Sequence, residues 1–230
     1  MSYFESDSHL FYGMELDDQQ QAFVQAIKNP KKIIVFCNAV AGTGKTTLAM
    51  GVANMLVKDK RTNYDGIIYI VSPYGEGRQG YLPGGQTEKS EVYFEPAYQA
   101  MVEVGMNPNA DIYYEPMAGK KGADGMGKKP GDGFVKLITH TYLRGNNTKN
   151  KVVIIDEAQN FTVPELKKVL TRLHDTCKAI VVGHTGQIDI SGRSGFAQYI
   201  KHFDGQERAE VCELTTNYRG WLSQYADQLR

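Results

Sequence analysis

Residues 33–47 of this chain read IIVFCNAVAGTGKTT. An apolar run leads directly into a glycine-rich turn, which a lysine and two threonines follow. This composition is typical of a buried strand, a phosphate-cradling turn and the first turn of a helix. Glycine lets the backbone approach a phosphate closely, and a helix N-terminus carries partial positive charge. The segment therefore predicts a nucleoside-triphosphate site of the P-loop type, with ATP and Mg²⁺ as expected cofactors.

Each residue of the turn has an expected task. The predicted phosphate-binding residues are Ala41, Gly42, Thr43, Gly44, Lys45, Thr46 and Thr47. Lys45 is expected to reach the β- and γ-phosphates, and the Thr46 hydroxyl is expected to ligate Mg²⁺. The full pattern has a glycine where this chain has Ala39, a modest loss because alanine is the next smallest residue. The alternative, a glycine turn without function, fits poorly with the strand before the turn and the amphipathic helix after it.

Short apolar runs alternate with helical patterns along the rest of the chain. The runs expected to form strands span residues 33–37, 67–71, 135–139, 152–155, 179–182 and 210–214. A helix is predicted over residues 164–173, with Thr162 as its cap. Strands that alternate with helices predict an α/β fold, a mainly parallel sheet with helices on both faces. We expect residues 1–230 to form one such domain.

Composition excludes several classes of protein. The formal net charge is zero, which argues against binding of nucleic acid over the whole protein surface but allows a local basic patch. No apolar run approaches the roughly 20 residues of a membrane span, and the polar start carries no secretory signal. Cys37, Cys177 and Cys212 lack metal-ligand spacing and are expected to be buried, reduced thiols. We expect a cytoplasmic protein.

Two carboxylates follow the apolar run at residues 152–155. At the carboxyl end of a parallel strand, Asp156 and Glu157 would face the ligand crevice. Asp156 is expected to hold Mg²⁺ through its water shell, and Glu157 to orient and deprotonate the attacking water. Two acids that merely end a strand are the alternative, which the phosphate loop elsewhere in the chain disfavours.

Three further features leave alternatives open. Gln20 either bonds the N6 and N7 edge of adenine or belongs to a polar helix face. Gln187, after another strand, could sense the γ-phosphate or the attacking water, whereas nearby His184 fits a surface histidine better. Residues 118–133 hold six glycines and four lysines, so this flexible stretch is either a solvated linker or a basic finger that touches nucleic-acid phosphates.

Taken together, these segments resemble the PhoH-like family of RecA-like P-loop ATPases, which are related to superfamily 1 helicases. The resemblance covers residues from about 20 to 218, with residues 107–133 as an insertion rich in glycine and lysine. Its most specific segments are DEAQN at 156–160, LTRL at 170–173 and QID at 187–189. It implies a RecA-like fold, ATP binding and hydrolysis, and an activity linked to RNA or single-stranded nucleic acid. It also raises the adenine role of Gln20 and the sensor role of Gln187.

The chain departs from the family pattern at Ala39, at Ser72 in a segment that usually holds an arginine, and at His184 where the family usually has an acid. It resembles the stand-alone form that bacteriophages carry. Superfamily 1 helicases complete the site with an arginine from a second RecA-like domain, which this chain lacks. We therefore expect a homo-oligomer, such as a hexameric ring, in which a neighbour supplies Arg219 or Arg193.

Three functions remain open at this point. The first is a nucleic-acid-stimulated ATPase of helicase or translocase type. The second is a small-molecule P-loop kinase, which the DEAQ motif disfavours. The third is a nucleotide-gated binding module that acts on a protein partner.

Overall fold

The computed structural model describes residues 10–73, 92–113, 133–143, 147–188, 190 and 193–226. Its centre is a six-stranded sheet with the strand order β5-β4-β6-β7-β3-β8. The strands are β3 (Ile34–Ala39), β4 (Gly66–Val71), β5 (Val135–Thr139), β6 (Lys151–Ile155), β7 (Lys178–Gly183) and β8 (Ala209–Leu214). All their pairings are parallel, so the predicted parallel α/β sheet is confirmed, with strand ends within two residues of the expected ones.

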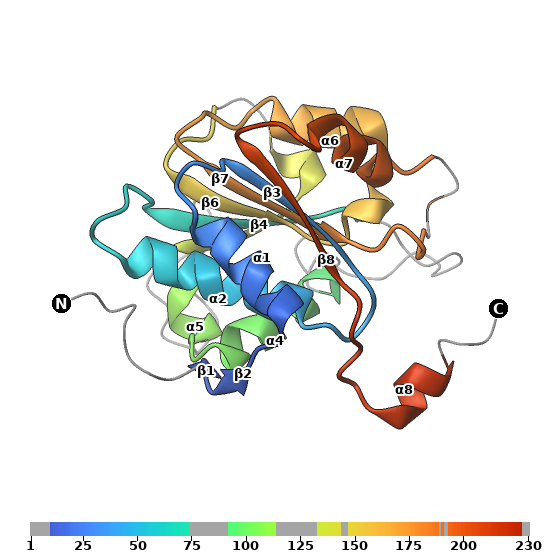
Figure 1. Cartoon of the computed structure of the whole chain (residues 1–230). Helices are drawn as coiled ribbons and strands as arrows, with labels where there is room; N and C mark the ends of the chain where they lie inside the picture. Colours follow the sequence, from blue (N-terminus) through green and yellow to red (C-terminus); the bar gives the residue numbers. More distant parts are fainter. Residues whose placement is uncertain are drawn as a thin grey trace, which may run out of the picture.

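Helices cover both faces of this sheet, as predicted (Figure 1). The helices on one face are α1 (Asp18–Lys28), α2 (Lys45–Lys58), α4 (Glu95–Glu103) and α5 (Pro108–Asp111). The helices on the other face are α6 (Val163–Leu170) and α7 (Phe196–Phe203). The helix α8 (Trp221–Ala226) projects away from the sheet beyond the end of β8 (Figure 1).

Smaller elements complete the described chain. A hairpin of β1 (Leu10–Phe11) and β2 (Met14–Glu15) precedes α1. Three short 3₁₀ turns are η1 (Val92–Phe94), η2 (His140–Tyr142) and η3 (Ala158–Asn160). Of the predicted insertion at 107–133, residues 107–113 include α5, and residues 114–132 lie outside the described part of the chain. Within that part, no helix has the length and apolarity needed to cross a membrane.

The helix predicted over residues 164–173 is shorter than expected. Its cap is correct, because Thr162 is the N-cap of α6 and its backbone N and its Oγ1 both donate to Glu165 Oε2 at 2.8 Å. The helix ends at Leu170 because the following residues form turns and Leu173 then forms a parallel bridge with Thr148. The Thr148 N donates to Arg172 O at 2.9 Å. Leu173 still packs on the core, which explains why its apolar periodicity resembled helix.

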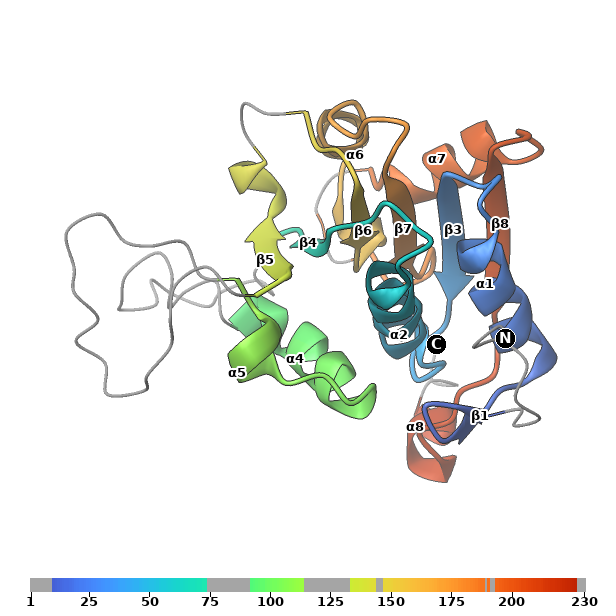
Figure 2. The ribbon, with the colours of Figure 1, turned by 90° about the vertical axis from the view of Figure 1, so that its left-hand side faces the viewer.

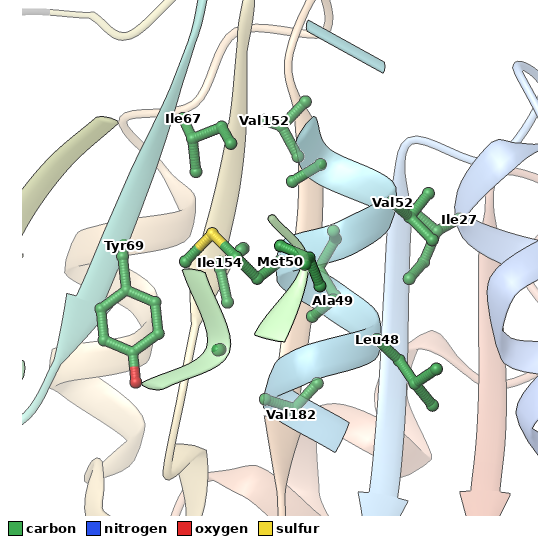
Figure 3. Close-up of a cluster of buried hydrophobic side chains, with 14 of the residues drawn as sticks. Ile27, Leu48, Ala49, Met50, Val52, Ile67, Tyr69, Val152, Ile154 and Val182 are labelled. Atoms are coloured by element: carbon green, nitrogen blue, oxygen red, sulfur yellow. The ribbon is translucent and has the colours of Figure 1, made fainter. Parts of the chain in front are cut away.

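Alternating side chains of each strand fill two separate cores. Val35 and Cys37 of β3 face the α1, α2 and α4 layer, whereas Ile34 and Phe36 face α6 and α7. Figure 3 shows the first core, where Met50 of α2 lies among side chains of β4 and β6. The inner strands β3, β4, β6 and β7 are almost entirely buried, which explains why the sequence shows continuous apolar runs there rather than alternation.

The three cysteines carry free thiols, as expected. Cys37 and Cys177 are buried, and Cys212 is half-buried. Burial raises the pKa of the Cys212 thiol to about 11, so the protonated form dominates at neutral pH.

Candidate nucleotide-binding site

The turn between β3 and α2 has the backbone that a phosphate cradle requires. Gly42 and Gly44 have φ values of 74° and 76°, in the left-handed region that glycine enters without steric cost. Gly44 is the N-cap of α2 and has no side chain to accept from the first helical N–H groups. These N–H groups and the helix dipole therefore point at the turn and favour a bound anion.

The structure brings the acidic pair at the end of β6 to this turn. Thr46 Oγ1 donates to Asp156 Oδ2 at 2.8 Å, and Lys45 Nζ lies 3.4 Å from Glu157 Oε1. Hydroxyl and carboxylate oxygens are ligands that Mg²⁺ accepts together with phosphate oxygens. The donor set of Thr46 and Asp156 therefore fits the expected metal.

Asp156 is fully buried and accepts hydrogen bonds from three groups. Besides Thr46, these are the Tyr69 hydroxyl, 2.6 Å from Oδ2, and the backbone N of Glu157, 2.8 Å from Oδ1. Burial, and then the nearby charge of Glu157, raise the pKa of Asp156 above its usual value. Sequence reasoning missed Tyr69, whose only signal is a hydroxyl within an otherwise aliphatic strand.

Glu157 adopts a strained backbone conformation at the centre of the site. Its φ of 49° and ψ of 44° are left-handed, a region that a residue with a Cβ rarely enters. The conformation directs its carboxylate to Lys45 on one side and to Gln159 on the other, whose Nε2 donates to Oε2 at 2.5 Å. Strain of this kind is commonly retained at functional sites.

Gln159 connects the ends of two neighbouring strands. Its buried amide donates to Glu157, and its Oε1 accepts from the backbone N of His184, after β7, at 3.0 Å. A Cβ on Gly183 would lie 2.6 Å from this Oε1, so glycine makes the approach possible. The sequence drew attention to Gln159 as part of the DEAQN segment but predicted no role for its side chain.

The predicted sensor lies further out. Gln187 is exposed in the turn after β7 and does not line the cavity described below. His184 is half-buried and contributes its backbone N–H to Gln159. The sensor role of Gln187 therefore stays a prediction, and Asp189 of the same motif lies outside the described residues.

Gln20 joins α1 to the phosphate turn. Asp17 Oδ1 accepts from the Gln20 N at 2.7 Å, and Gln20 Oε1 accepts in return from the Asp17 N at 3.1 Å, which forms a capping box. Gln20 Nε2 donates to Thr43 O at 3.0 Å. The amide lines the same cavity as the turn, so adenine recognition by Gln20 stays a prediction, beside its clear role in positioning the turn.

The segment after β8, residues 215–219, crosses the phosphate turn and is called the strap below. Thr215 donates from its N and its Oγ1 to Gln19 Oε1, at 2.9 and 3.0 Å. Tyr218 donates from its N to Gly42 O at 2.8 Å and from its hydroxyl to Asp17 at 2.5 Å. The strap thereby holds Arg219 beside the turn of its own chain.

A cavity of about 460 Å³ opens beside the turn. Its lining residues from the turn and α2 are Gly42, Thr43, Gly44, Lys45, Thr46, Thr47 and Leu48. The remaining lining residues come from the hairpin, α1, α4 and the strap: Met14, Glu15, Leu16, Gln20, Pro96, Gln99, Ala100, Glu103, Tyr218 and Arg219. Ala41 and Arg193, which the sequence also suggested, do not line it. The volume lies in the range of small-molecule sites.

Comparison with known proteins of similar sequence indicates a family for this chain. A family model described as "PhoH-like protein" matches residues 15–219. A PhoH-like protein of Mycobacterium leprae is 31% identical over 215 residues, which are 90% of this chain and 56% of that protein. Protein PhoH of Escherichia coli is 30% identical over 204 residues, which are 86% of this chain and 52% of that protein. The chain thus spans about half the length of these relatives.

A solved structure shares the fold. The crystal structure of the HK97 bacteriophage large terminase has a TM-score of 0.52 and 16% sequence identity, and the match covers 94% of this chain and 43% of that one. At this identity the likeness concerns the fold, an α/β P-loop NTPase of the predicted RecA-like class. With the phosphate turn, the acidic pair and a family match over residues 15–219, the chain belongs to the PhoH-like family.

Proposed function

We propose that this chain binds ATP with Mg²⁺ and hydrolyses it. The observation that carries the proposal is the pair of contacts between the phosphate turn and the end of β6, Thr46 with Asp156 and Lys45 with Glu157. These residues are far apart in sequence, and their meeting supplies a cation for the phosphates, oxygen ligands for the metal and a base for water. Bound Mg²⁺ would neutralise charge on the β- and γ-phosphates.

The two partners of Glu157 suggest how its carboxylate is used. In this structure Oε1 faces Lys45 and Oε2 accepts from Gln159. We infer that Lys45 turns to the phosphates when ATP binds, because phosphate oxygens carry more negative charge than one carboxylate. Oε1 is then left to accept a proton from water while Gln159 keeps the side chain in place.

The assay is steady-state hydrolysis of Mg-ATP by the wild type and by Lys45→Ala and Glu157→Gln variants. Lys45→Ala should weaken ATP binding, whereas Glu157→Gln should bind ATP and lose turnover by about a hundredfold or more. Glu207→Gln is the matched control, because it changes an exposed carboxylate just before β8, at the amino ends of the strands and away from the turn. Normal turnover by Glu157→Gln would refute the assignment of the base.

We further propose that hydrolysis is coupled to RNA or single-stranded DNA. The proposal rests on the family resemblance, and exposed aromatic side chains of α8 support it. Trp221 and Tyr225 are 72% and 62% exposed, with ring centroids 5.3 Å apart and nearly parallel planes. Such rings can stack on bases. Residues 118–132 of the basic stretch and Arg144, which sequence reasoning also suggested, lie outside the described residues.

The same assay separates the alternatives. Strong stimulation by single-stranded RNA or DNA supports the coupled ATPase, and loss of that stimulation in Trp221→Ala would place α8 in the contact. Slow turnover that no nucleic acid changes supports the nucleotide-gated binding module. Transfer of the γ-phosphate to a small acceptor supports the kinase.

We propose that Arg219 acts on the nucleotide of its own chain. It lines the cavity beside the turn, and a Cβ on Gly42 would lie 2.9 Å from its Cγ.

Mixing two inactive variants distinguishes this proposal from the predicted oligomer, in which a neighbouring subunit supplies this arginine. An equimolar mixture of Lys45→Ala and Arg219→Ala proteins stays inactive if Arg219 acts within its chain. Recovered ATPase activity in the mixture would instead support the neighbour and the ring.

A further inference from the structure

The contacts at the phosphate turn define the direction in which a nucleotide lies. Lys45 and Thr46 face Glu157 and Asp156, so the β- and γ-phosphates and the metal belong on the β6 side. Neither acid lines the 460 Å³ cavity, which opens from the same turn toward the hairpin and α4. The nucleoside therefore extends past Thr47 into this cavity.

A carboxylate of α4 stands at the entrance to that space. Glu103 is the last residue of α4, and its Oε2 accepts from Thr47 Oγ1 at 2.6 Å. The helix α4 lies beside α2 (Figure 2). Thr47 belongs to the first turn of α2. Pro96, Gln99 and Ala100 line the cavity from the same helix. One face of α4 is thus a wall of the nucleoside compartment.

Glu103 lies at the C-terminus of α4 and next to the first turn of α2. A negative charge at the C-terminus of a helix is opposed by the helix dipole, and here the N-terminus of α2 and the Thr47 hydroxyl compensate. A carboxylate beside a bound phosphate is also repelled unless a hydrogen-bond donor lies between the two anions. The ribose, which is joined to the α-phosphate, carries two such donors.

We propose that Glu103 accepts hydrogen bonds from the ribose hydroxyls and makes this site selective for ribonucleotides over deoxyribonucleotides. An ionised carboxylate only accepts, and its two oxygens have room for about four hydrogen bonds, so the Thr47 contact leaves capacity for a diol. Acidic side chains bind ribose hydroxyls in this way in dinucleotide-binding folds. The inference rests on the proposed nucleotide site and names the residue that reads its sugar.

The test is calorimetric titration with Mg-ADP, 2′-deoxy-ADP and 3′-deoxy-ADP, because diphosphates avoid turnover. The wild type should bind ADP about tenfold more tightly than the weaker-binding deoxy analogue, the value of one hydrogen bond to a charged group. Glu103→Gln keeps an acceptor for Thr47 and should reduce this ratio to about threefold or less. Glu103→Ala should abolish it, and Glu207→Gln should retain it.

The outcomes are distinguishable. Equal ratios in the wild type and Glu103→Ala, or a wild type that does not discriminate, overturn the role of Glu103 and leave the nucleotide site intact. Tighter binding of all three ligands by Glu103→Ala, with an unchanged ratio, shows that the carboxylate only repels phosphate and likewise overturns it. A wild type that binds no ADP refutes the nucleotide site itself. Thermal unfolding of each variant controls for folding, which an exposed side chain should not affect.

Discussion

Replacing Asp156 with asparagine should stabilise the nucleotide-free protein and remove its response to Mg²⁺. The carboxylate is fully buried, and burial together with Glu157 raises its pKa. Both effects disfavour the ionised form that the metal needs. The site therefore reduces the stability of the nucleotide-free fold, and the neutral isostere should recover that free energy.

The surrounding hydrogen bonds can survive the change. Thr46 and Tyr69 contact Oδ2 through hydroxyl groups, which can accept as well as donate, so an asparagine Nδ2 can donate to both. Asparagine Oδ1 still accepts from the backbone N of Glu157. Each of these three groups can thus keep one hydrogen bond to asparagine, whereas Asp156→Ala removes the acceptor for three donors.

The expected gain for Asp156→Asn at neutral pH is about 1–2 kcal/mol, because Lys45 offsets part of the cost of the buried charge. For a chain of this size the melting temperature should rise by about 2–8 °C. Asp156→Ala should instead lose about 1–3 kcal/mol for its unpaired donors. With Mg-ADP added, the wild type should gain further stability, and the asparagine variant should gain little.

Chemical denaturation between pH 4 and pH 8 checks the cause. Because the pKa of Asp156 is raised in the folded state, the unfolded chain ionises first as the pH rises, and the wild type loses stability until the folded pKa is passed. The advantage of asparagine should therefore be small near pH 4 and grow toward neutral pH. A variant that is less stable than the wild type at pH 7, or an advantage independent of pH, would refute this reasoning.

Three further predictions concern single residues. Gln159→Leu removes the donor to Glu157 and should lower kcat about tenfold or more with ADP affinity unchanged; an equal fall in affinity would contradict a positioning role. Gly195→Ala should destabilise the fold by about 1–3 kcal/mol in urea, since its Cβ would lie 2.8 Å from the backbone N of Val163; an unchanged midpoint would count against this packing. Burial lowers the pKa of Lys178 to about 8 in the folded protein. The unfolded chain therefore keeps this proton to a higher pH than the folded protein does. The stability of the wild type relative to Lys178→Met should thus increase by up to about 3 kcal/mol between pH 8 and pH 10.5. A difference in stability between the two proteins that does not change over that pH range would show that burial does not destabilise the Lys178 cation.

The elements of this fold were predictable because their signals are local. Continuous apolar runs predicted the inner strands β3, β4, β6 and β7, since strands covered on both faces need no polar alternation. The edge strands β5 and β8 were predicted from shorter runs that contain Lys136 and Glu213. Local signals also placed the glycine turn before α2 and the acids after β6. Local signals were less accurate at the end of α6. There the apolar periodicity continues to Leu173, although the helix ends at Leu170.

The sequence by itself therefore determined the α/β class, the glycine turn before α2 and the two acids that lie beside it. Only the tertiary structure decided which distant side chains complete the site. Tyr69 on Asp156, Glu103 on Thr47 and Arg219 beside its own turn are contacts that no spacing in the chain encodes. Periodicity and turn chemistry act over a few residues, whereas these contacts depend on how the strands order themselves and on which helix faces pack together.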